Sequence, residues 1–296
     1  MELGYWLSGE EHAAPAQVRY AQMAEAIGFR WVMVSDHFHP WIDRQGQSPF
    51  VWSVLGGIAA TTRSLHVATG VTCPLFRIHP AILAQAAATV ATMFEGRFAL
   101  GVGTGENLNE HVLGHHWPPY PVRREMLHEA VDVMRLLWGG GLRSHRGKYY
   151  TVEHARLYSL PDQPIPIFVA AEGPLSGKLA GRIGDGLIAS ARNKEVLAAF
   201  AQGGGEGKPR HGWVTMCWGR SKQEAVRTVH ERWPSILLDG RLARDLPLPQ
   251  HFESAARFVT EEMIAKAVLC GPIPSLTSRG SRNTGRPVSP RYTSIN

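Results

Sequence analysis

Two histidines and an aspartate stand close together in the stretch SDHFHPW, residues 35–41. Asp36, His37 and His39 are residue types that bind zinc, but a zinc site needs three or four converging ligands. The sequence contains no HExxH motif that would complete such a set, so we expect no metal here. Two interpretations remain open: a proton-transfer site, or a strand end at which Asp36 caps a turn and His37 fills a gap.

A second polar cluster favours the proton-transfer interpretation. The stretch GTGENLNE, residues 103–110, follows another apolar run and carries Glu106 and Asn109. Together with His37 these residues supply an imidazole, a carboxylate and an amide, a set that is able to move a proton. The preceding GVGTG reads GxGxG rather than GxGxxG, so it does not predict a Rossmann dinucleotide site.

A third motif, AAEGP at residues 170–174, predicts a site for an anionic group. Gly173 and Pro174 stand where we expect a helix to begin. The free N–H groups of a helix N-terminus bind phosphate readily, so this segment is a candidate phosphate cradle.

These motifs occupy corresponding places in a repeated pattern of strand-like and helix-like segments. Short β-branched or aromatic runs alternate with stretches whose apolar residues recur at helical spacing. Seven such units predict an α/β fold, a (β/α)8 TIM-type barrel, in which catalytic residues lie at the carboxyl ends of the strands. The expected strands are 3–7, 29–36, 64–74, 97–105, 166–173, 185–191 and 211–219, and the expected helices are 14–28, 48–62, 79–96, 122–140, 174–184 and 221–233.

Four segments depart from the pattern. Residues 147–164 are typical of a hairpin insertion, and 202–210, QGGGEGKPR, of a flexible link. Residues 253–272 are amphipathic and predict a helix. Residues 273–296 lack periodicity and are rich in Ser, Thr and Arg, so we expect a disordered or frameshifted tail where the final strand and helix should be. The barrel domain is therefore assigned to residues 1–272.

The composition argues against several classes of protein. The 296 residues carry a net charge of +6, but four arginines lie in the last 24 residues and the remainder carries only +2, so we expect no nucleic-acid partner. Three widely separated cysteines and the absence of a signal-like N-terminus predict a cytoplasmic protein. No stretch approaches the ~20 apolar residues that span a bilayer, so we expect no membrane partner.

The residues singled out above belong to a larger set of motifs. The set comprises SDHF with Trp41, TGVTCP-x-FR, LGVGTGENLNE, Trp117-Pro118, GKYY and AAEGP…AGRIGDG. Across residues 3–272 it resembles the coenzyme F-420-dependent glucose-6-phosphate dehydrogenase group of the bacterial luciferase-like barrel superfamily. The resemblance implies a luciferase-like barrel, a homodimer, coenzyme F-420 as cofactor, and hydride transfer to it from a secondary alcohol or from the hemiacetal of a sugar or sugar phosphate.

The resemblance also implies roles for individual residues. His37 would be the general base, Asp36 would orient its imidazole, and Trp41 and Glu106 would be the other catalytic residues. A cis peptide bond between Gly70 and Val71 would back the deazaflavin. The implied cofactor-binding residues are Asp36, Gly70, Val71, Cys73, Asn109, Ala170, Ala171, Glu172, Gly173 and Pro174, and the implied substrate-binding residues are Glu10, Arg192, Asn193 and Lys194.

Departures from the group leave alternatives open. Where the group has a lysine for the substrate phosphate, this chain has Asn193, flanked by Arg192 and Lys194. One alternative function is an FMN-dependent monooxygenase of the same superfamily, because the cofactor decides the reaction. The other is a truncated protein that is inactive or only binds the cofactor, because an unclosed barrel exposes two edges.

Overall fold

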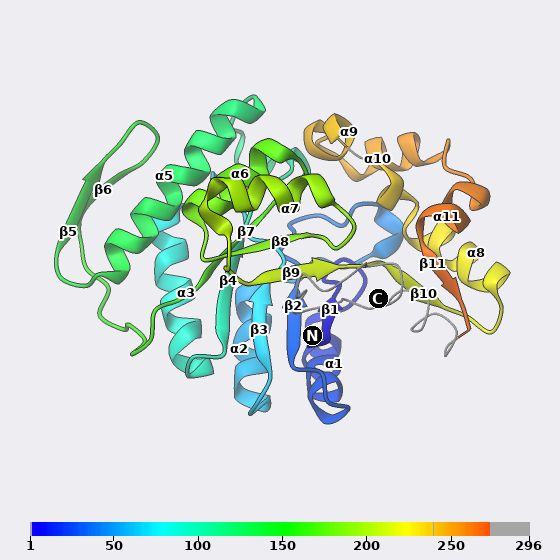
Figure 1. Cartoon of the computed structure of the whole chain (residues 1–296), viewed down its shortest axis with the longest axis horizontal. Helices are drawn as coiled ribbons and strands as arrows, with labels where there is room; N and C mark the ends of the chain where they lie inside the picture. Colours follow the sequence, from blue (N-terminus) through cyan, green and yellow to red (C-terminus); the bar gives the residue numbers. More distant parts are fainter. Residues whose placement is uncertain (1, 239, 273–296) are drawn as a thin grey trace.

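Seven parallel strands form the central sheet of the computed structural model, which describes residues 2–238 and 240–272. Their order is β1-β2-β3-β4-β7-β8-β9, so successive strands of the β/α pattern lie side by side (Figure 1). The tail expected over residues 273–296 lies outside the described residues. The strands are β1 (Gly4–Leu7), β2 (Trp31–Val34), β3 (His66–Thr69), β4 (Phe98–Val102), β7 (Ile167–Ala170), β8 (Gly186–Ser190) and β9 (Arg210–Trp213).

Helices connect these strands and cover the outer face of the sheet (Figure 1). Two of them begin with a proline, Pro80 and Pro174, whose fixed φ suits the first helical turn. The helices are α1 (Ala14–Ala26), α2 (Val51–Thr61), α3 (Pro80–Phe94), α5 (Tyr120–Trp138), α6 (Pro174–Ile183) and α7 (Lys194–Phe200), with the short α4 (Asn107–Glu110) after β4. Within the described residues no helix is both long enough and apolar enough to cross a membrane.

The strands are buried on both faces because their side chains alternate between two apolar clusters. In β2, Val32 and Val34 belong to the core shared with the helices, whereas Met33 belongs to an inner cluster. The inner cluster comprises Met33, Ala68, Ala99, Phe168 and Ile188, one from each of five strands. Two covered faces and the β/α order confirm the predicted TIM-type architecture.

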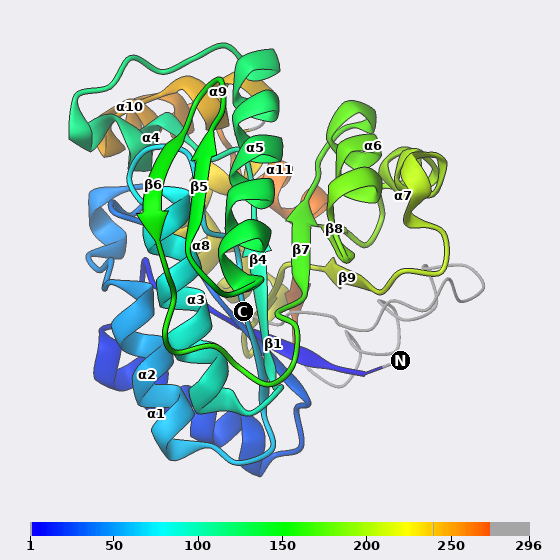
Figure 2. The same cartoon turned by 90° about the vertical axis from the view of Figure 1, so that its left-hand side faces the viewer.

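The hairpin expected within residues 147–164 is present but begins earlier. Strand β5 (Arg143–Arg146) pairs antiparallel with β6 (Thr151–Ala155). The hairpin lies beside α5 (Figure 2), where Glu129 accepts hydrogen bonds from the backbone N–H groups of Tyr149 and Tyr150. These bonds fix the insertion to the outside of the fold, apart from the strand ends.

The last expected strand and helix are each divided in two. Within 211–219 the chain leaves β9, which pairs with β8, and forms β10 (Met216–Trp218), which pairs with β11 (Leu269–Gly271) instead. Thr260 interrupts the helix expected over 253–272, because its hydroxyl accepts from the N–H of Met263 at 3.3 Å and caps a new helix. The elements of this part, grouped at the right of Figure 1, are α8 (Lys222–Arg232), α9 (Gly240–Asp245), α10 (Pro249–Ala256), α11 (Glu261–Ala267), β10 and β11. In the described part of the chain, β1 and β9 are therefore the edges of the central sheet.

The glycine-rich segment 202–210 is not the flexible link that we expected. Helix α7 continues into a helical turn at residues 201–205 that packs against α6. A Cβ atom on Gly203 would overlap the carbonyl oxygen of Lys178 in α6. The glycines therefore let two helical backbones approach closely, a use that composition alone does not distinguish from a linker.

A bulge lies at the carboxyl end of β3. Ala68 pairs with Ala99 of β4, but the next pair is Thr72 with Val102, so β3 contains one more residue than β4 over this interval. The bulge includes the cis peptide bond between Gly70 and Val71 that the resemblance implied.

The GVGTG motif begins in β4, and its glycines allow the chain to pass close to the bulge. A Cβ atom on Gly101 would overlap the carbonyl oxygen of Thr69, and one on Gly103 would lie 2.8 Å from Cγ2 of Val71. The glycines are therefore required by packing against β3 rather than by a dinucleotide.

Replacing Gly101 with alanine should destabilise the fold, because the obstructing atom is backbone and cannot rotate away. We expect Gly101→Ala to lower the free energy of unfolding by at least about 2 kcal/mol, which chemical denaturation would measure. Gly56→Ala is the matched control, since a Cβ at this position in α2 meets no atom within 4 Å. The control should gain about 0.5–1 kcal/mol of stability, and equal stabilities of the two variants would contradict the close approach.

Candidate active site

The carboxyl ends of five parallel strands place most of the expected site residues on one side of the sheet. Glu10 follows β1, His37 follows β2, the bulge follows β3, Glu106 follows β4 and Glu172 follows β7. Asp36 and Asn109 lie among them but have structural partners described below. This convergence is the arrangement in which barrels hold their catalytic groups.

The imidazole of His37 is held from two sides. Its Nδ1 lies 3.1 Å from the backbone oxygen of His39, and its Nε2 lies 3.5 Å from Oε1 of Glu10. A carbonyl oxygen only accepts, so Nδ1 carries the proton and Nε2 is the nitrogen that is free to take another. The Glu10 carboxylate is placed to stabilise the imidazolium that would result.

Glu10 is itself fixed by two hydroxyl groups. Ser8 and Ser35 both donate to its Oε2, at 2.9 and 2.8 Å. The carboxylate is buried, with the residue only 3% exposed, so these bonds compensate for its lost hydration. The other oxygen, Oε1, remains directed at His37.

An aromatic side chain covers the imidazole. The ring centroids of Trp41 and His37 lie 5.0 Å apart, and Trp41 meets Phe252 of α10 edge-on at 5.2 Å. Phe252 is fully buried and was not among the residues that the sequence singled out. It reaches the site from more than 200 positions along the chain, and it lies just before the helix expected over 253–272, so no expected element contained it.

The expectation that Asp36 orients His37 is wrong. Its Oδ2 accepts from the hydroxyl of Thr72 at 2.7 Å, and its Oδ1 accepts from Nη2 of Arg77 at 2.6 Å. Both oxygens are therefore used to join the end of β2 to the bulge of β3. The ring of His37 is oriented by Glu10 and the carbonyl of His39 instead.

Arg77 and Glu110 extend this buried network and were missed in the sequence. Glu110 Oε2 accepts from the N–H of Arg77 at 2.9 Å, and its Oε1 lies 3.7 Å from Nε of Arg77. Burial raises the pKa of Glu110 to about 6, although the N–H and guanidinium of Arg77 act in the opposite direction. Both residues stand inside motifs that we examined, TGVTCP-x-FR and GTGENLNE, but nothing in their spacing distinguishes them from surface charges.

Asn109 joins two loops rather than presenting its carbonyl to the site. Its Oδ1 accepts from the backbone N–H groups of Phe38 at 2.9 Å and His39 at 3.3 Å. The ring of His39 bonds in turn to the carbonyl of Leu108 at 2.9 Å. His39 thus anchors the loop against α4, and contact of Asn109 with a cofactor remains a prediction.

Glu106 is paired with an arginine that the sequence did not indicate. Nη1 of Arg244, in α9, binds Glu106, and its Nη2 binds Glu172. Burial lowers the pKa of Arg244, but the two carboxylates outweigh it and raise the pKa, so the guanidinium stays charged. The pair brings together residues that lie about 140 positions apart.

The start of α6 has the form of the expected phosphate cradle. The hydroxyl of Ser176 accepts from the N–H groups of Glu172 and Gly173, both at 3.2 Å. The first helical N–H groups beyond Pro174 have no partner within the helix. A Cβ at Gly173 would meet no atom within 4 Å, so the space in front of the helix is open to an anionic group.

Of the three substrate-binding residues expected after β8, one has a structural role and two lie on the surface. Asn193 caps α7 by accepting from the N–H of Val196, and its amide donates to the carbonyl of Glu172 at 2.9 Å. Arg192 and Lys194 on either side are exposed. Contact of any of the three with a substrate remains a prediction.

The bulge at the end of β3 lies between the ends of β2 and β4. Cys73 is buried against Gly105, whose φ of +71° suits glycine, and burial raises the pKa of its thiol well above the ordinary value. Ala171 is buried and Ala170 partly so at the neighbouring strand end. The strand ends next to the bulge therefore carry small side chains and a neutral thiol.

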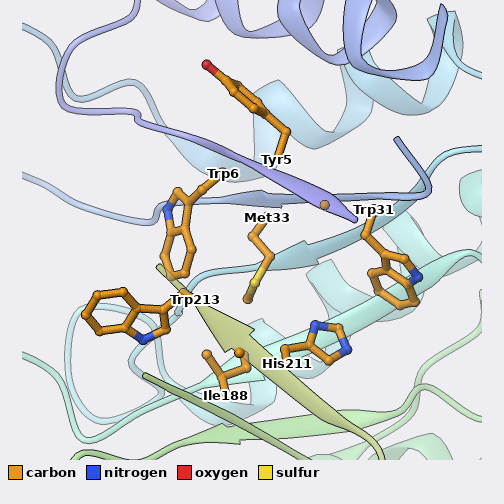
Figure 3. Close-up of a pocket in the computed structure, with 9 residues that line it drawn as sticks. Tyr5, Trp6, Trp31, Met33, Ile188, His211 and Trp213 are labelled. Atoms are coloured by element: carbon orange, nitrogen blue, oxygen red, sulfur yellow. The ribbon is translucent and has the colours of Figure 1, made fainter. Parts of the chain in front are cut away.

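A small apolar pocket is lined by residues of β1, β2, β8 and β9 (Figure 3). Trp6, Met33, Ile188 and His211 point into it, whereas Tyr5 points away. A Cβ on Gly70 would lie 2.7 Å from Cζ2 of Trp6, so this indole supports the bulge from below. The pocket contains none of the expected catalytic residues.

No group of three or more His, Cys, Asp or Glu side chains within residues 2–238 and 240–272 is arranged to hold a metal ion. His37 and His39 bond to backbone carbonyls through Nδ1 and face different neighbours.

Fold and site together define an α/β barrel protein whose candidate active groups come from the carboxyl ends of several strands. A family model described as luciferase-like monooxygenase matches residues 1–275. The chain belongs to this luciferase-like family.

Curated relatives and a solved structure show the same similarity. An F-420-dependent hydroxymycolic acid dehydrogenase of Mycobacterium tuberculosis is 46% identical over 204 residues, which are 68% of this chain and 57% of that protein. An F-420-dependent glucose-6-phosphate dehydrogenase of Microbacterium testaceum is 40% identical over 188 residues, 64% of this chain and 56% of that protein. The chain thus spans less than two thirds of the length of these relatives. A solved F-420-dependent secondary alcohol dehydrogenase, in complex with an F-420–acetone adduct, matches with a TM-score of 0.91 at 29% identity over 99% of this chain and 92% of that one.

The raised pKa of Glu110 predicts a pH-dependent stability. A carboxyl group that binds its proton more tightly in the folded chain than in the unfolded chain loses stabilising effect as the pH rises through both pKa values, here from about 4.5 to about 6. Glu110→Gln removes this loss, so the stability of the variant relative to the parent should rise by roughly 1–2 kcal/mol between those pH values. Denaturant unfolding at a series of pH values measures it.

Glu153→Gln, an exposed carboxylate on β6, is the control and should leave the pH dependence unchanged. A constant difference between Glu110→Gln and the parent over this range would show that Glu110 titrates normally.

Proposed function

We propose that this chain is an oxidoreductase that uses coenzyme F-420 and removes a hydride from the carbon of a secondary alcohol or hemiacetal. The observation that carries the proposal is the His37 ring, oriented at a strand end by the His39 carbonyl and Glu10 so that only Nε2 is free to accept a proton. The similarity to three proteins named for F-420-dependent dehydrogenation supports the choice of cofactor.

The residues at the strand ends fit this cofactor. The Gly70–Val71 bulge, with Cys73 beside it, would lie against the ring system of the cofactor. The open space before Gly173 offers the α6 N-terminus to a phosphate. When bound, coenzyme F-420 supplies a carbon that accepts a hydride.

In this proposal His37 takes the proton of the substrate hydroxyl at Nε2. Glu10 stabilises the resulting imidazolium at 3.5 Å, and the His39 carbonyl keeps the ring from rotating. Trp41 covers the imidazole and excludes water from it. Glu106, tied to Arg244, presents a second carboxylate after β4.

We further propose a small-molecule substrate, a cytoplasmic location and a homodimer. Arg192 and Lys194, both exposed after β8, would contact a phosphate on the substrate, whereas Asn193 is already used as a helix cap. Comparison of glucose with glucose 6-phosphate as substrates tests whether the site recognises the phosphate that these two residues would contact.

Removal of the proposed base should greatly slow turnover while the protein still folds. We expect His37→Gln to lower kcat by about 10²–10⁴-fold with little change in KM, because the amide cannot accept the hydroxyl proton. His128→Gln, on the exposed face of α5, is the control and should behave as the parent. An unchanged kcat for His37→Gln at saturating substrate would remove His37 from the mechanism.

The cofactor assignment is tested by parallel titrations. F-420 and FMN are added separately to the purified chain, and binding is followed by fluorescence. We expect saturable binding of F-420 and its reduction when propan-2-ol or a sugar is added. Tighter binding of FMN with substrate-dependent oxygen uptake would favour a monooxygenase, and binding of neither cofactor would contradict the proposed function.

A further inference from the structure

We infer that Arg244 is a positioning residue of the active site that acts through Glu106, an inference that rests on the proposed function. Its guanidinium joins the carboxylate at the end of β4 to the carboxylate before α6. The resemblance assigns no role to this arginine, and nothing in its local sequence, GRLARD, distinguishes it from its neighbour Arg241.

The backbone of α9 is fixed next to the site, so the side chain of Arg244 extends from a fixed position. The amide of Asn107 donates to the carbonyl of Asp245 at 3.0 Å, which ties the end of α9 to the start of α4. Nη1 of Arg123, on α5, lies 3.7 Å from Oδ1 of Asp245. These contacts hold the residue that follows Arg244 against the same loop that carries Glu106.

The side chain of Arg244 is well suited to bridging two carboxylates. Nη1 and Nη2 bind different acids, Glu106 and Glu172, and the planar guanidinium fixes the angle between the two bonds. Only 24% of the Arg244 side chain and 20% of that of Glu106 is exposed, so water screens this pair weakly. A lysine would supply the charge but not the planar fork of two N–H donor groups.

Glu106 depends on this arginine for its orientation. Among the contacts of the described residues, Arg244 is the one partner of its carboxylate, and its side chain makes no capping bond to α4. Glu10, by comparison, is held by Ser8 and Ser35. Without Arg244 the Glu106 carboxylate would therefore be free to rotate.

Charge argues against the competing role of binding an anionic substrate. One guanidinium already faces two carboxylates, so the group of Arg244, Glu106 and Glu172 carries a net negative charge. An added phosphate would have to displace an existing ion pair. The exposed Arg192 and Lys194 are better placed to receive one.

The test compares Arg244→Gln, Arg244→Lys and the control Arg241→Gln. Arg241 lies on the same helix with its side chain 96% exposed, so its variant should match the parent. For F-420 reduction by propan-2-ol or glucose 6-phosphate, we expect Arg244→Gln to lower kcat about 10–100-fold with KM changed less than about threefold. Arg244→Lys should recover part of the loss, because the charge remains but the fork does not.

A double-mutant cycle provides a readout that does not depend on turnover. The dissociation constant of F-420 and the melting temperature of the cofactor-free protein are measured for Arg244→Gln, Glu106→Gln and the double variant. If Arg244 acts through Glu106, adding Arg244→Gln to Glu106→Gln should change either quantity much less than Arg244→Gln does alone. Additive effects would overturn the inference.

The kinetic outcomes also separate the possible failures. An unchanged kcat in Arg244→Gln, in a parent enzyme that turns over, would overturn the role of Arg244 but leave the proposed function intact. A rise in KM confined to glucose 6-phosphate with unchanged kcat would overturn it in favour of substrate binding. A parent that neither binds nor reduces F-420 would instead contradict the proposed function.

Discussion

The close passage of β4 over the bulge of β3 is the constraint on which the rest of the site depends. Gly101 has no room for a Cβ beside the Thr69 carbonyl oxygen, and Gly103 packs against Val71. The backbones therefore meet without side chains between them, and β4 holds the bulge in place at the carboxyl end of β3. The loop that carries His37 is joined to the bulge by a buried hydrogen bond between Asp36 and Thr72.

Those contacts form a chain through Asp36. This carboxylate accepts from Thr72 in the bulge and from Arg77, and Arg77 in turn meets Glu110 at the end of α4. The loop that carries His37 and the loop that carries Glu106 are thus both joined to the segment that follows β3. The network is buried, so displacing one partner would leave a charge without compensation. This penalty keeps the two loops in one arrangement.

The two candidate acid-base groups are supported in different ways. His37 and Glu10 draw their partners from the ends of β1 and β2, which are adjacent strands of the sheet. Glu106 draws its partner, Arg244, from the segment between β10 and β11, outside the central sheet. The part of the chain that diverges from the regular β/α pattern therefore contributes directly to the site.

The sequence by itself determined the alternation of strands and helices, and with it the side of the sheet on which the polar motifs would meet. Apolar periodicity is a local property, so the sequence alone shows it. Parallel strands place all their carboxyl ends at the same end of the sheet, so His37 and Glu106 could be assigned to one candidate site from the sequence. The partners of these groups could not be assigned. Asp36 stands next to His37 in the chain yet bonds to Thr72, and Arg244 reaches Glu106 across about 140 residues. Only the tertiary structure decided such pairs, because a hydrogen bond depends on the distance and direction between two atoms, and neither is encoded in local spacing.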